Sequence, residues 1–345
     1  MTTGAYDNII LSHGSGGALT RSLIEDVFLK AFDNPLLRPL NDQAVLHIEP
    51  DAKTGARQRL AFTTDSYVIS PIFFPGADIG KLAVCGTIND LAVGGAEALY
   101  LSASFIMEEG LPMADLKRVV RSMADTALAA GVRIVTGDTK VVERGKADRL
   151  FINTAGIGVL NGHALIPENI SPGDAIIVSG TIGDHGVAVM THRHGIAMDT
   201  PVISDCAALN GLVNDMLATG ANVKAMRDAT RGGVATALNE FAASAGCAML
   251  ICEDDIPVKN EVRGACELLG FEPLYLANEG KLVAVVENGH AKTLLESMRT
   301  HPLGKDAAII GFVSTAPKGK VLLETTIGNK RILDMPAGEL LPRIC

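Results

Sequence analysis

The chain has 345 residues, a net charge of −9 and 48% hydrophobic residues, and its 36 glycines indicate a loop-rich protein. This length allows two domains with separate cores, and the high apolar content excludes an intrinsically disordered chain. The acidic balance and the absence of a Lys/Arg block exclude the clustered basic face that a phosphate backbone requires, so we predict no nucleic-acid partner.

No run of about 18 apolar residues is present, so we expect no transmembrane helix and no membrane partner. The first residues lack a basic region followed by an apolar stretch, which predicts no signal peptide and a cytoplasmic location. The six cysteines form no CxxC pair, and we expect free thiols. Cys85, Cys247 and Cys266 lie among apolar or small residues and are predicted to be core residues.

The first half of the chain alternates predicted strands and helices. Strands are expected at residues 44–48, 60–64, 99–105 and 150–159. One helix is predicted over 79–93, ending at Gly94-Gly95, and another over 113–130, ending at Gly131. Pro112 fits the first turn of the second helix.

The stretch 167–174 combines two prolines, a glycine and polar residues, and marks a domain boundary. The alternation then resumes, with strands at 175–179, 282–286 and 307–313, helices at 186–192, 207–218 and 233–245, and a hairpin over 320–325 and 330–333. We therefore predict an α/β (α+β) fold of two domains, residues 1–165 and 166–333, each a mixed sheet covered by helices.

Residues 334–345 show no periodicity and contain two prolines and a glycine, so they are predicted to be a mobile tail that carries Cys345. Fully extended, this segment spans about 36 Å at about 3.3 Å per residue. The adjacent carboxylate raises the expected thiol pKa of Cys345, so it suits a group acceptor better than an activated nucleophile. An accidental terminal cysteine is the alternative.

Five aspartates at strand or loop edges are candidates for a divalent metal site. They are Asp42, Asp65, Asp90, Asp138 and Asp228. Magnesium prefers oxygen ligands shared with nucleotide phosphates, although aspartate is also common at turns and helix caps. Asp90 is the best candidate, because it stands inside an apolar helical pattern where no cap explains it.

Two glycine-rich segments and one glutamate are further candidates. Residues 12–17, with Gly14, Ser15, Gly16 and Gly17, could cradle phosphates, although GxxxxGK[ST] is absent. Residues 180–186 could line a cleft or only shape a turn. Glu279 is a candidate acid, base or phosphate-side residue, with a plain loop carboxylate as the alternative. His192 and His194 are two apart on a predicted helix and are expected to be solvent-exposed rather than metal ligands.

Five motifs together resemble one superfamily of ATP-dependent enzymes over essentially the whole chain. They are Gly86-Thr87-Ile88-Asn89-Asp90, Gly137-Asp138-Thr139-Lys140, Arg227-Asp228-Ala229-Thr230-Arg231-Gly232-Gly233, Asn278-Glu279-Gly280 and the terminal Pro342-Arg343-Ile344-Cys345. The superfamily includes aminoimidazole ribonucleotide synthetase, selenophosphate synthetase and thiamine-monophosphate kinase. Within it, the chain is most similar to the hydrogenase maturation family HypE, the carbamoyl dehydratases.

The resemblance implies a homodimer formed through strands of the first domain, and an ATP and Mg2+ site in that domain. It implies Mg2+ on Asp42, Asp65, Asp90 and Asp228. It implies ATP contacts from Asn89, Gly137, Asp138, Thr139, Lys140 and the loop of residues 12–17. The position before Asp42 is often acidic in relatives and is Asn41 here, which removes one potential metal ligand.

The resemblance also implies a reaction and its partners. A HypF-like carbamoyltransferase places a carbamoyl group on Cys345. ATP then phosphorylates the carbamoyl oxygen, and loss of phosphate and of the nitrogen's proton leaves a thiocyanate. Lys140 would offset charge on the phosphate, and Glu279 or Asp138 would act as the base. The cyanide would pass to an iron site on a HypC–HypD-like scaffold for [NiFe]-hydrogenase.

Three alternative functions are compatible with parts of this pattern. A selenophosphate synthetase would carry a Cys or selenocysteine near the glycine loop, where this chain has Ser12, His13 and Ser15. A thiamine-monophosphate kinase would leave the cysteine tail unexplained. A non-catalytic adaptor that presents its C-terminal peptide would bind partners without consuming ATP.

Overall fold

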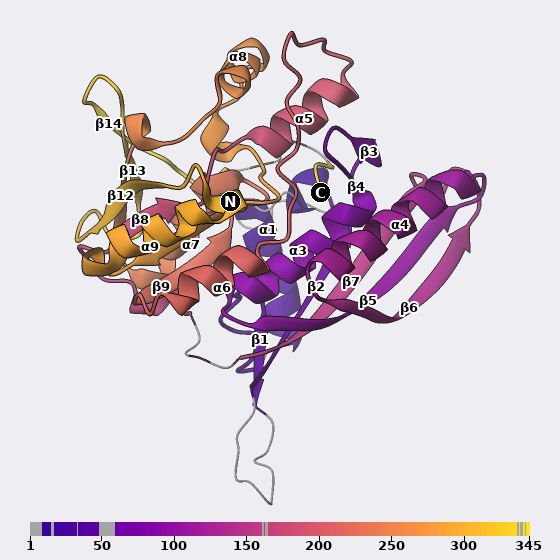
Figure 1. The fold of residues 1–345 in the computed structure, drawn as a ribbon, viewed down its shortest axis with the longest axis horizontal. Coiled ribbons are helices and arrows are strands. Elements are labelled where there is room, and N and C mark those ends of the chain that lie inside the picture. Colours follow the sequence, from indigo (N-terminus) through magenta and orange to yellow (C-terminus); the bar gives the residue numbers. More distant parts are fainter. Residues whose placement is uncertain are drawn as a thin grey trace, which may run out of the picture.

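The protein is described by a computed structural model over residues 9–14, 17–32, 34–47, 59–160, 162, 165–336, 338, 341 and 343–345. The chain forms two mixed β-sheets, one in each half of the sequence, and helices pack on both of them (Figure 1). Of the predicted glycine loop, Ser15 and Gly16 lie outside the described residues.

The first sheet has five strands in the order β1-β2-β7-β5-β6. Its strands are β1 (Ala44–His47), β2 (Arg59–Tyr67), β5 (Glu97–Glu108), β6 (Arg133–Val142) and β7 (Leu150–Val159). Neighbouring strands are antiparallel except for the β5–β6 pair, which is parallel. A short hairpin, β3 (Phe73–Phe74) and β4 (Ala77–Asp78), precedes the first large helix.

Helices α3 (Ile79–Val93) and α4 (Met113–Ala129) pack on one face of this sheet. Helix α3 is buried on nearly every side, because it also contacts the second half of the chain. The opposite face of the sheet carries exposed apolar side chains, and strand pairing sets Phe62, Ile157 and Tyr100 in one row. That face is therefore a candidate interface.

The second sheet has seven strands in the order β14-β13-β10-β12-β8-β11-β9. Its strands are β8 (Ala175–Val178), β9 (Val223–Asp228), β10 (Ala248–Cys252), β11 (Leu282–Val286), β12 (Ala308–Ser314), β13 (Val321–Glu324) and β14 (Lys330–Ile332). Strands β8 and β11 are buried along their whole length, as central strands covered on both faces must be.

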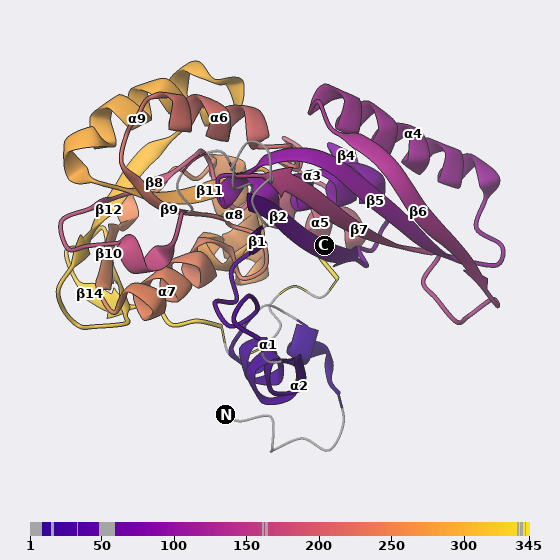
Figure 2. The ribbon, with the colours of Figure 1, turned by 90° about the horizontal axis from the view of Figure 1, so that it is seen from below.

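Alternate residues of these central strands face two different helical layers. Ile176 and Val178 pack with α7 (Gly233–Ala245), while Ala175 and Ile177 pack with α6 (Asn210–Ala218) and α9 (Asn288–Thr300). Figure 2 shows α7 on one side of this sheet and α6 with α9 on the other. The predicted covering of the sheets by helices is confirmed.

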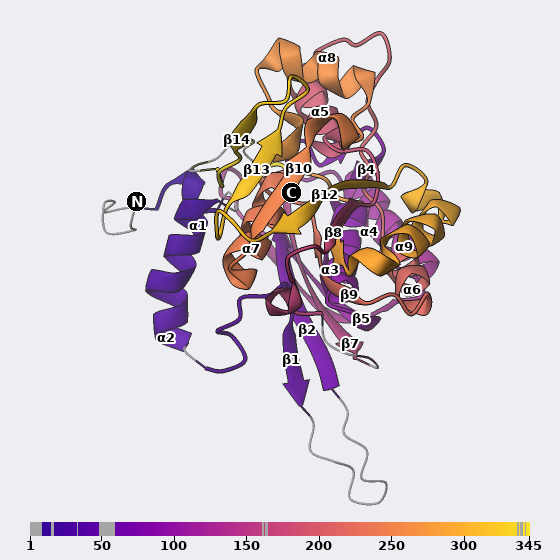
Figure 3. The same cartoon turned by 90° about the vertical axis from the view of Figure 1, so that its left-hand side faces the viewer.

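Helices α5 (Asp184–Arg193) and α8 (Asn260–Leu269) belong to the second half by sequence, yet they pack with the core of the first half. Near the N-terminus, α1 (Ala18–Leu23), a π-helical turn (Ile24–Leu29) and α2 (Lys30–Phe32) run together as one helix beside the body (Figure 3).

Several smaller expectations are resolved by the structure. Cys85, Cys247 and Cys266 are buried free thiols, as predicted, and His192 and His194 are exposed. Pro112 caps α4 from just outside its first turn, and not from within it. Among the described residues, every helix is too short or too polar to cross a membrane.

Candidate functional site

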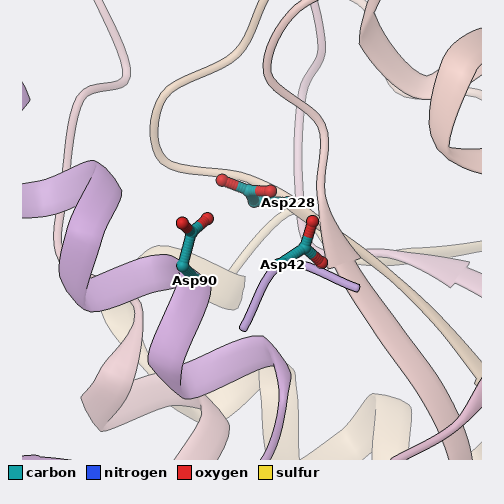
Figure 4. Close-up of side chains that lie close together, drawn as sticks. All are labelled: Asp42, Asp90 and Asp228. Carbon is teal, nitrogen blue, oxygen red and sulfur yellow. The ribbon is translucent and has the colours of Figure 1, made fainter. Parts of the chain in front are cut away.

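Three of the predicted metal ligands converge at the junction of the two halves. Carboxylate oxygens of Asp42, Asp90 and Asp228 all lie within 4.8 Å of one another (Figure 4). Asp42 lies two residues before β1, Asp90 lies in the last turn of α3, and Asp228 ends β9. The cluster therefore depends on the packing of α3 and the start of β1 against β9 of the second half.

Asp65 lies beside this cluster and faces the same cavity, which has a volume of about 360 Å3. The hydroxyl of Tyr67 donates a hydrogen bond to Oδ2 of Asp65 at 3.1 Å. A cavity of a few hundred Å3 with convergent polar groups is typical of a small-molecule site. All four aspartates proposed for the metal thus line one cavity.

Mutual repulsion and burial dominate the electrostatics of the cluster. Burial, followed by the charges of Asp65, Asp228 and Asp42, holds the pKa of Asp90 well above its usual range. Burial and the neighbouring Asp42 raise the pKa of Asp228 to about 8. Such a set of oxygen ligands fits a hard divalent cation, whose charge would offset the repulsion.

Two contacts orient these carboxylates. The hydroxyl of Thr63 donates to Oδ2 of Asp90 at 2.8 Å. The guanidinium of Arg227 donates to Asp42 at 3.1 Å and also pairs with Glu240. Neither Thr63 nor Arg227 was assigned a role from the sequence, although Arg227 directly precedes Asp228 in a motif that was recognised.

The C-terminal cysteine ends inside this cavity. The backbone N–H of Val68 donates to the backbone oxygen of Cys345 at 3.1 Å, and Cys345 lines the cavity together with the aspartates. Burial raises the pKa of the Cys345 thiol to about 12, although the nearby Arg231 guanidinium acts in the opposite direction. Residues 343–345 of the predicted tail are therefore docked, and the thiol of Cys345 lies in the cavity of the acidic cluster.

Glu279 is the carboxylate that best fits an acid–base role. It is 2% exposed and lines the cavity with Cys345. Its Oε1 is buried without a hydrogen-bond partner in the described part of the chain. Burial, then the charges of Asp228 and Asp205, raise the pKa of Glu279 well above its usual range, which makes its carboxylate a stronger base.

Asn89 was expected to contact ATP, but its side chain makes other contacts. Its amide nitrogen donates to the carbonyls of Ala207 and Glu279, and its Oδ1 accepts from the N–H of Leu209 at 2.7 Å. Asn89 therefore joins α3 to the second half of the chain and does not line the cavity. One residue along a helix turns a side chain by about 100°, so Asp90 reaches the cavity and Asn89 does not.

The predicted phosphate-side residues Gly137, Asp138, Thr139 and Lys140 lie on β6, the outer strand of the first sheet. Pairing sets Asp138 opposite Ser104, Ser104 opposite Asn153, and Asn153 opposite Ser66. Paired residues share a face of a sheet, so Asp138 and Lys140 lie on the face opposite Asp65. Thr139 shares the face of Asp65 but stands three strands away, about 14 Å. Within one chain these residues do not meet the cavity.

Asp138 and Lys140 instead pair with each other at 2.7 Å on the exposed face. The hydrogen bond from Lys140 lowers the pKa of Asp138, so this carboxylate is a weaker base than Glu279.

The described part of the glycine loop contacts the tail. A Cβ added to Gly17 would lie 2.3 Å from the carbonyl oxygen of Pro336, so only glycine allows this close approach. The N–H of Ala18 donates to the same oxygen at 3.1 Å. The first part of the loop forms a short 3-10 turn, Leu11–Gly14.

The segment 180–186 begins a helix and does not line the cavity. Gly183 has φ of 86° at the start of α5, and its N–H donates to Oδ1 of Asn278 at 2.7 Å. The turn alternative is therefore the one that the structure supports, and it fixes the start of α5.

Comparisons with known proteins agree on one family. The family "AIR synthase related protein, N-terminal domain" matches residues 40–160, and "AIR synthase related protein, C-terminal domain" matches residues 171–324. The chain is 53% identical over 343 residues to carbamoyl dehydratase HypE of Rhizobium leguminosarum bv. viciae, which covers 99% of this chain and 96% of that protein.

Two solved structures are similar along nearly the whole chain. A HypE–HypF complex contains a chain with a TM-score of 0.85 and 50% identity, covering 91% of this chain and 100% of that one. A HypE structure in complex with ATP has a TM-score of 0.81 and 47% identity, covering 98% of this chain and 100% of that one.

Proposed function

The chain belongs to the HypE family of carbamoyl dehydratases, within the AIR synthase related proteins, and we propose that it uses ATP to convert a carbamoyl group on Cys345 into a thiocyanate. The observation that carries this proposal is the Cys345 thiol, which ends in the same cavity as four aspartates and Glu279. ATP binding is supported by the similar HypE structure solved with ATP.

The proposed metal is Mg2+, held by Asp42, Asp90 and Asp228, with Asp65 beside them. The cluster fits such an ion, because its ligand oxygens lie within 4.8 Å of one another and repel in its absence. When bound, Mg2+ would neutralise charge on the phosphates of ATP.

The reaction needs a better leaving group than a carbamoyl oxygen. In S–C(=O)–NH2 that oxygen attacks the γ-phosphorus of ATP, ADP leaves, and the oxygen departs later as phosphate. The nitrogen gives up both of its protons in the course of the two steps, and the product is S–C≡N. Every atom is accounted for by ATP, the carbamoyl group and two released protons.

The residues of this chain would orient the group and move the protons. Glu279 is our choice for the base, because its unpaired, buried Oε1 lies in the cavity of Cys345. Arg231, which is close enough to Cys345 to perturb its pKa, would offset negative charge on the carbamoyl oxygen as it is phosphorylated.

Glu279→Gln should leave carbamoylation of Cys345 and ATP binding intact and slow the conversion to thiocyanate by about a hundredfold or more, the usual range for loss of a positioned base. Glutamine keeps the size of the side chain and removes its basicity. Mass spectrometry of the tail would follow both modifications. Glu287→Gln, at an exposed glutamate outside the cavity, is the matched control. Thiocyanate formation at the normal rate in the Glu279 variant would reject this assignment.

We further propose a homodimer in which the open face of the first sheet meets its copy. This face carries an exposed row of Phe62, Ile157 and Tyr100. Asp138 and Lys140 belong to the same face and cannot reach the cavity of their own chain. The dimer would bring Lys140 of one copy toward the phosphates bound in the other copy. Lys140 could then still offset charge on the phosphate, as proposed.

Mixing two impaired variants tests this arrangement. Lys140→Ala and Glu279→Gln homodimers should each form thiocyanate slowly, but a mixed dimer should recover activity at one of its two sites. That site combines Glu279 of one copy with Lys140 of the other. If Lys140 acts within its own chain, both sites of the mixed dimer carry a defect, so the absence of recovery in a verified heterodimer would overturn the shared site.

The proposed partners follow from the family. A similar HypE was solved as a complex with HypF, and we propose a HypF-like carbamoyltransferase as the source of the carbamoyl group. We propose a HypC–HypD-like scaffold as the acceptor of the cyanide for [NiFe]-hydrogenase, and the cytoplasm as the location. A selenophosphate synthetase, a thiamine-monophosphate kinase or an adaptor would leave the docked Cys345 without a purpose.

A further inference from the structure

Helix α5 contacts the C-terminal tail through the side chains of His185 and Arg193. His185 lies in its first turn and Arg193 is its last residue. We propose that His185 and Arg193 form a docking site for the C-terminal peptide, one that binds the main chain of residues 343–345 and so holds the tail in the cavity whatever group its thiol carries.

The contact of His185 is fully buried. Its Nε2 lies 2.8 Å from the carbonyl oxygen of Ile344, and its Nδ1 lies 2.8 Å from the hydroxyl of Ser204. A carbonyl only accepts hydrogen bonds, so Nε2 carries the proton and Nδ1 accepts from Ser204. Burial lowers the pKa of His185, which favours this neutral form. The ring of Phe74 meets the imidazole edge-on and fixes its plane.

Arg193 binds the preceding carbonyl of the tail. Its Nη2 donates to the carbonyl oxygen of Arg343 at 2.7 Å, and its Nε donates to the carbonyl oxygen of Ser70 at 2.6 Å. One guanidinium thus joins the tail to the segment that follows β2. A planar side chain with several donors is suited to bridging two carbonyls in this way.

That same segment pairs with the tail as an added strand would. The N–H of Val68 donates to the oxygen of Cys345 at 3.1 Å, and the N–H of Ser70 donates to the oxygen of Arg343 at 3.3 Å. The side chain of Ile344, between them, is 4% exposed and packs in the core of the first half. Main-chain bonds give affinity to such a strand, and the buried alternate side chain fixes its register.

These contacts explain how one site accepts a changing substrate. They involve the carbonyl oxygens of residues 343 and 344 and a backbone oxygen of Cys345, and the Cys345 thiol contributes to none of them. The free thiol, the carboxamide and the nitrile can therefore dock in the same register. The carried groups rest on the proposed function, whereas docking can be measured on the free thiol without turnover.

The test is the rate at which iodoacetamide alkylates Cys345 in the full-length protein, followed by mass spectrometry of the tail. His185→Ala and Arg193→Ala should each raise this rate by about five- to tenfold, the factor expected when one hydrogen bond is lost. His185→Gln keeps a donor near Nε2 and should restore a slow rate. His192→Ala, at the exposed histidine of the same helix, is the matched control and should react like the unchanged protein.

Unchanged alkylation in both alanine variants would overturn the docking site. Arg193 is only partly buried, so its variant decides the matter if His185→Ala fails to fold in a thermal scan. A turnover readout separates positioning from chemistry: both variants should accept the carbamoyl group normally and form thiocyanate more slowly. Faster alkylation in a protein that never forms thiocyanate supports the docking site and rejects only the proposed function.

Discussion

A Cys345→Ala protein should bind ATP with unchanged affinity and form no thiocyanate at all. The thiol sulfur is the proposed point of attachment of the carbamoyl group, and a methyl group offers no atom to replace it. The acidic cluster does not involve this side chain, so nucleotide binding should persist. Calorimetry measures the affinity for ATP. Mass spectrometry of the tail, after incubation with the carbamoyltransferase, carbamoyl donor and ATP, measures the formation of thiocyanate.

Cys252→Ala provides the control for Cys345→Ala. Cys252 is a partly buried free thiol at the end of β10 and does not line the cavity. This variant should form thiocyanate on Cys345 like the unchanged protein. A nitrile found on any other residue of the Cys345→Ala protein would disprove the assignment.

Asp90→Asn should change stability in opposite directions with and without the metal. In the metal-free protein the folded-state pKa values of Asp90 and Asp228 are raised, that of Asp228 to about 8. The unfolded value is about 3.9, so ionisation between these pH values favours the unfolded chain. Replacing Asp90 with a residue that cannot ionise should therefore raise the melting temperature of the metal-free protein at pH 7 to 8, by about 1–2 °C for each kcal/mol gained in a chain of this length.

With Mg2+ and ATP bound, the Asp90→Asn variant should instead have the lower melting temperature of the two proteins. A ligand at a hundredfold excess over its Kd stabilises a folded protein by about 2.7 kcal/mol, and Asp90→Asn should lose most of this gain because an amide is a weaker metal ligand than a carboxylate. Scanning calorimetry with and without Mg2+ and ATP measures both shifts. Asp125→Asn, at an exposed aspartate on α4, should behave like the unchanged protein. An undiminished ligand-induced shift in the Asp90 variant would argue against Asp90 as a ligand.

The apolar patterns predicted the most buried elements best. Helix α3 has the predicted bounds, Ile79–Val93, because both of its ends carry local signals, an Asp cap and two glycines. Strand β11 also matches, because it is a short apolar run that is buried throughout, and β7 matches as a long strand whose residues alternate between buried and more exposed. Strand β6 was missed, because this exposed edge strand contains Gly137 and several polar residues and lacks an alternating pattern.

The site was predicted more completely than the contacts around it. Aspartates at element ends pointed to one cluster, and the fold brings them together. The sequence could not assign Asn89 and Asp90 to different sides of α3, because that division depends on the second domain packed against the helix. The sequence implied that Cys345 enters the ATP cleft, but it could not identify the residues that hold the tail there, because those on α5 and after β2 are more than a hundred residues away.

The raised pKa of the docked thiol has a consequence for the protein between reaction cycles. A thiol with a pKa of about 12 is almost entirely protonated at neutral pH, and the thiolate is the form that peroxides oxidise. The docked position should therefore protect the free thiol of Cys345, the proposed carrier, from sulfenic acid formation before it is carbamoylated again. We therefore expect a peroxide to oxidise the docked thiol of Cys345 more slowly than a cysteine thiol with an ordinary pKa.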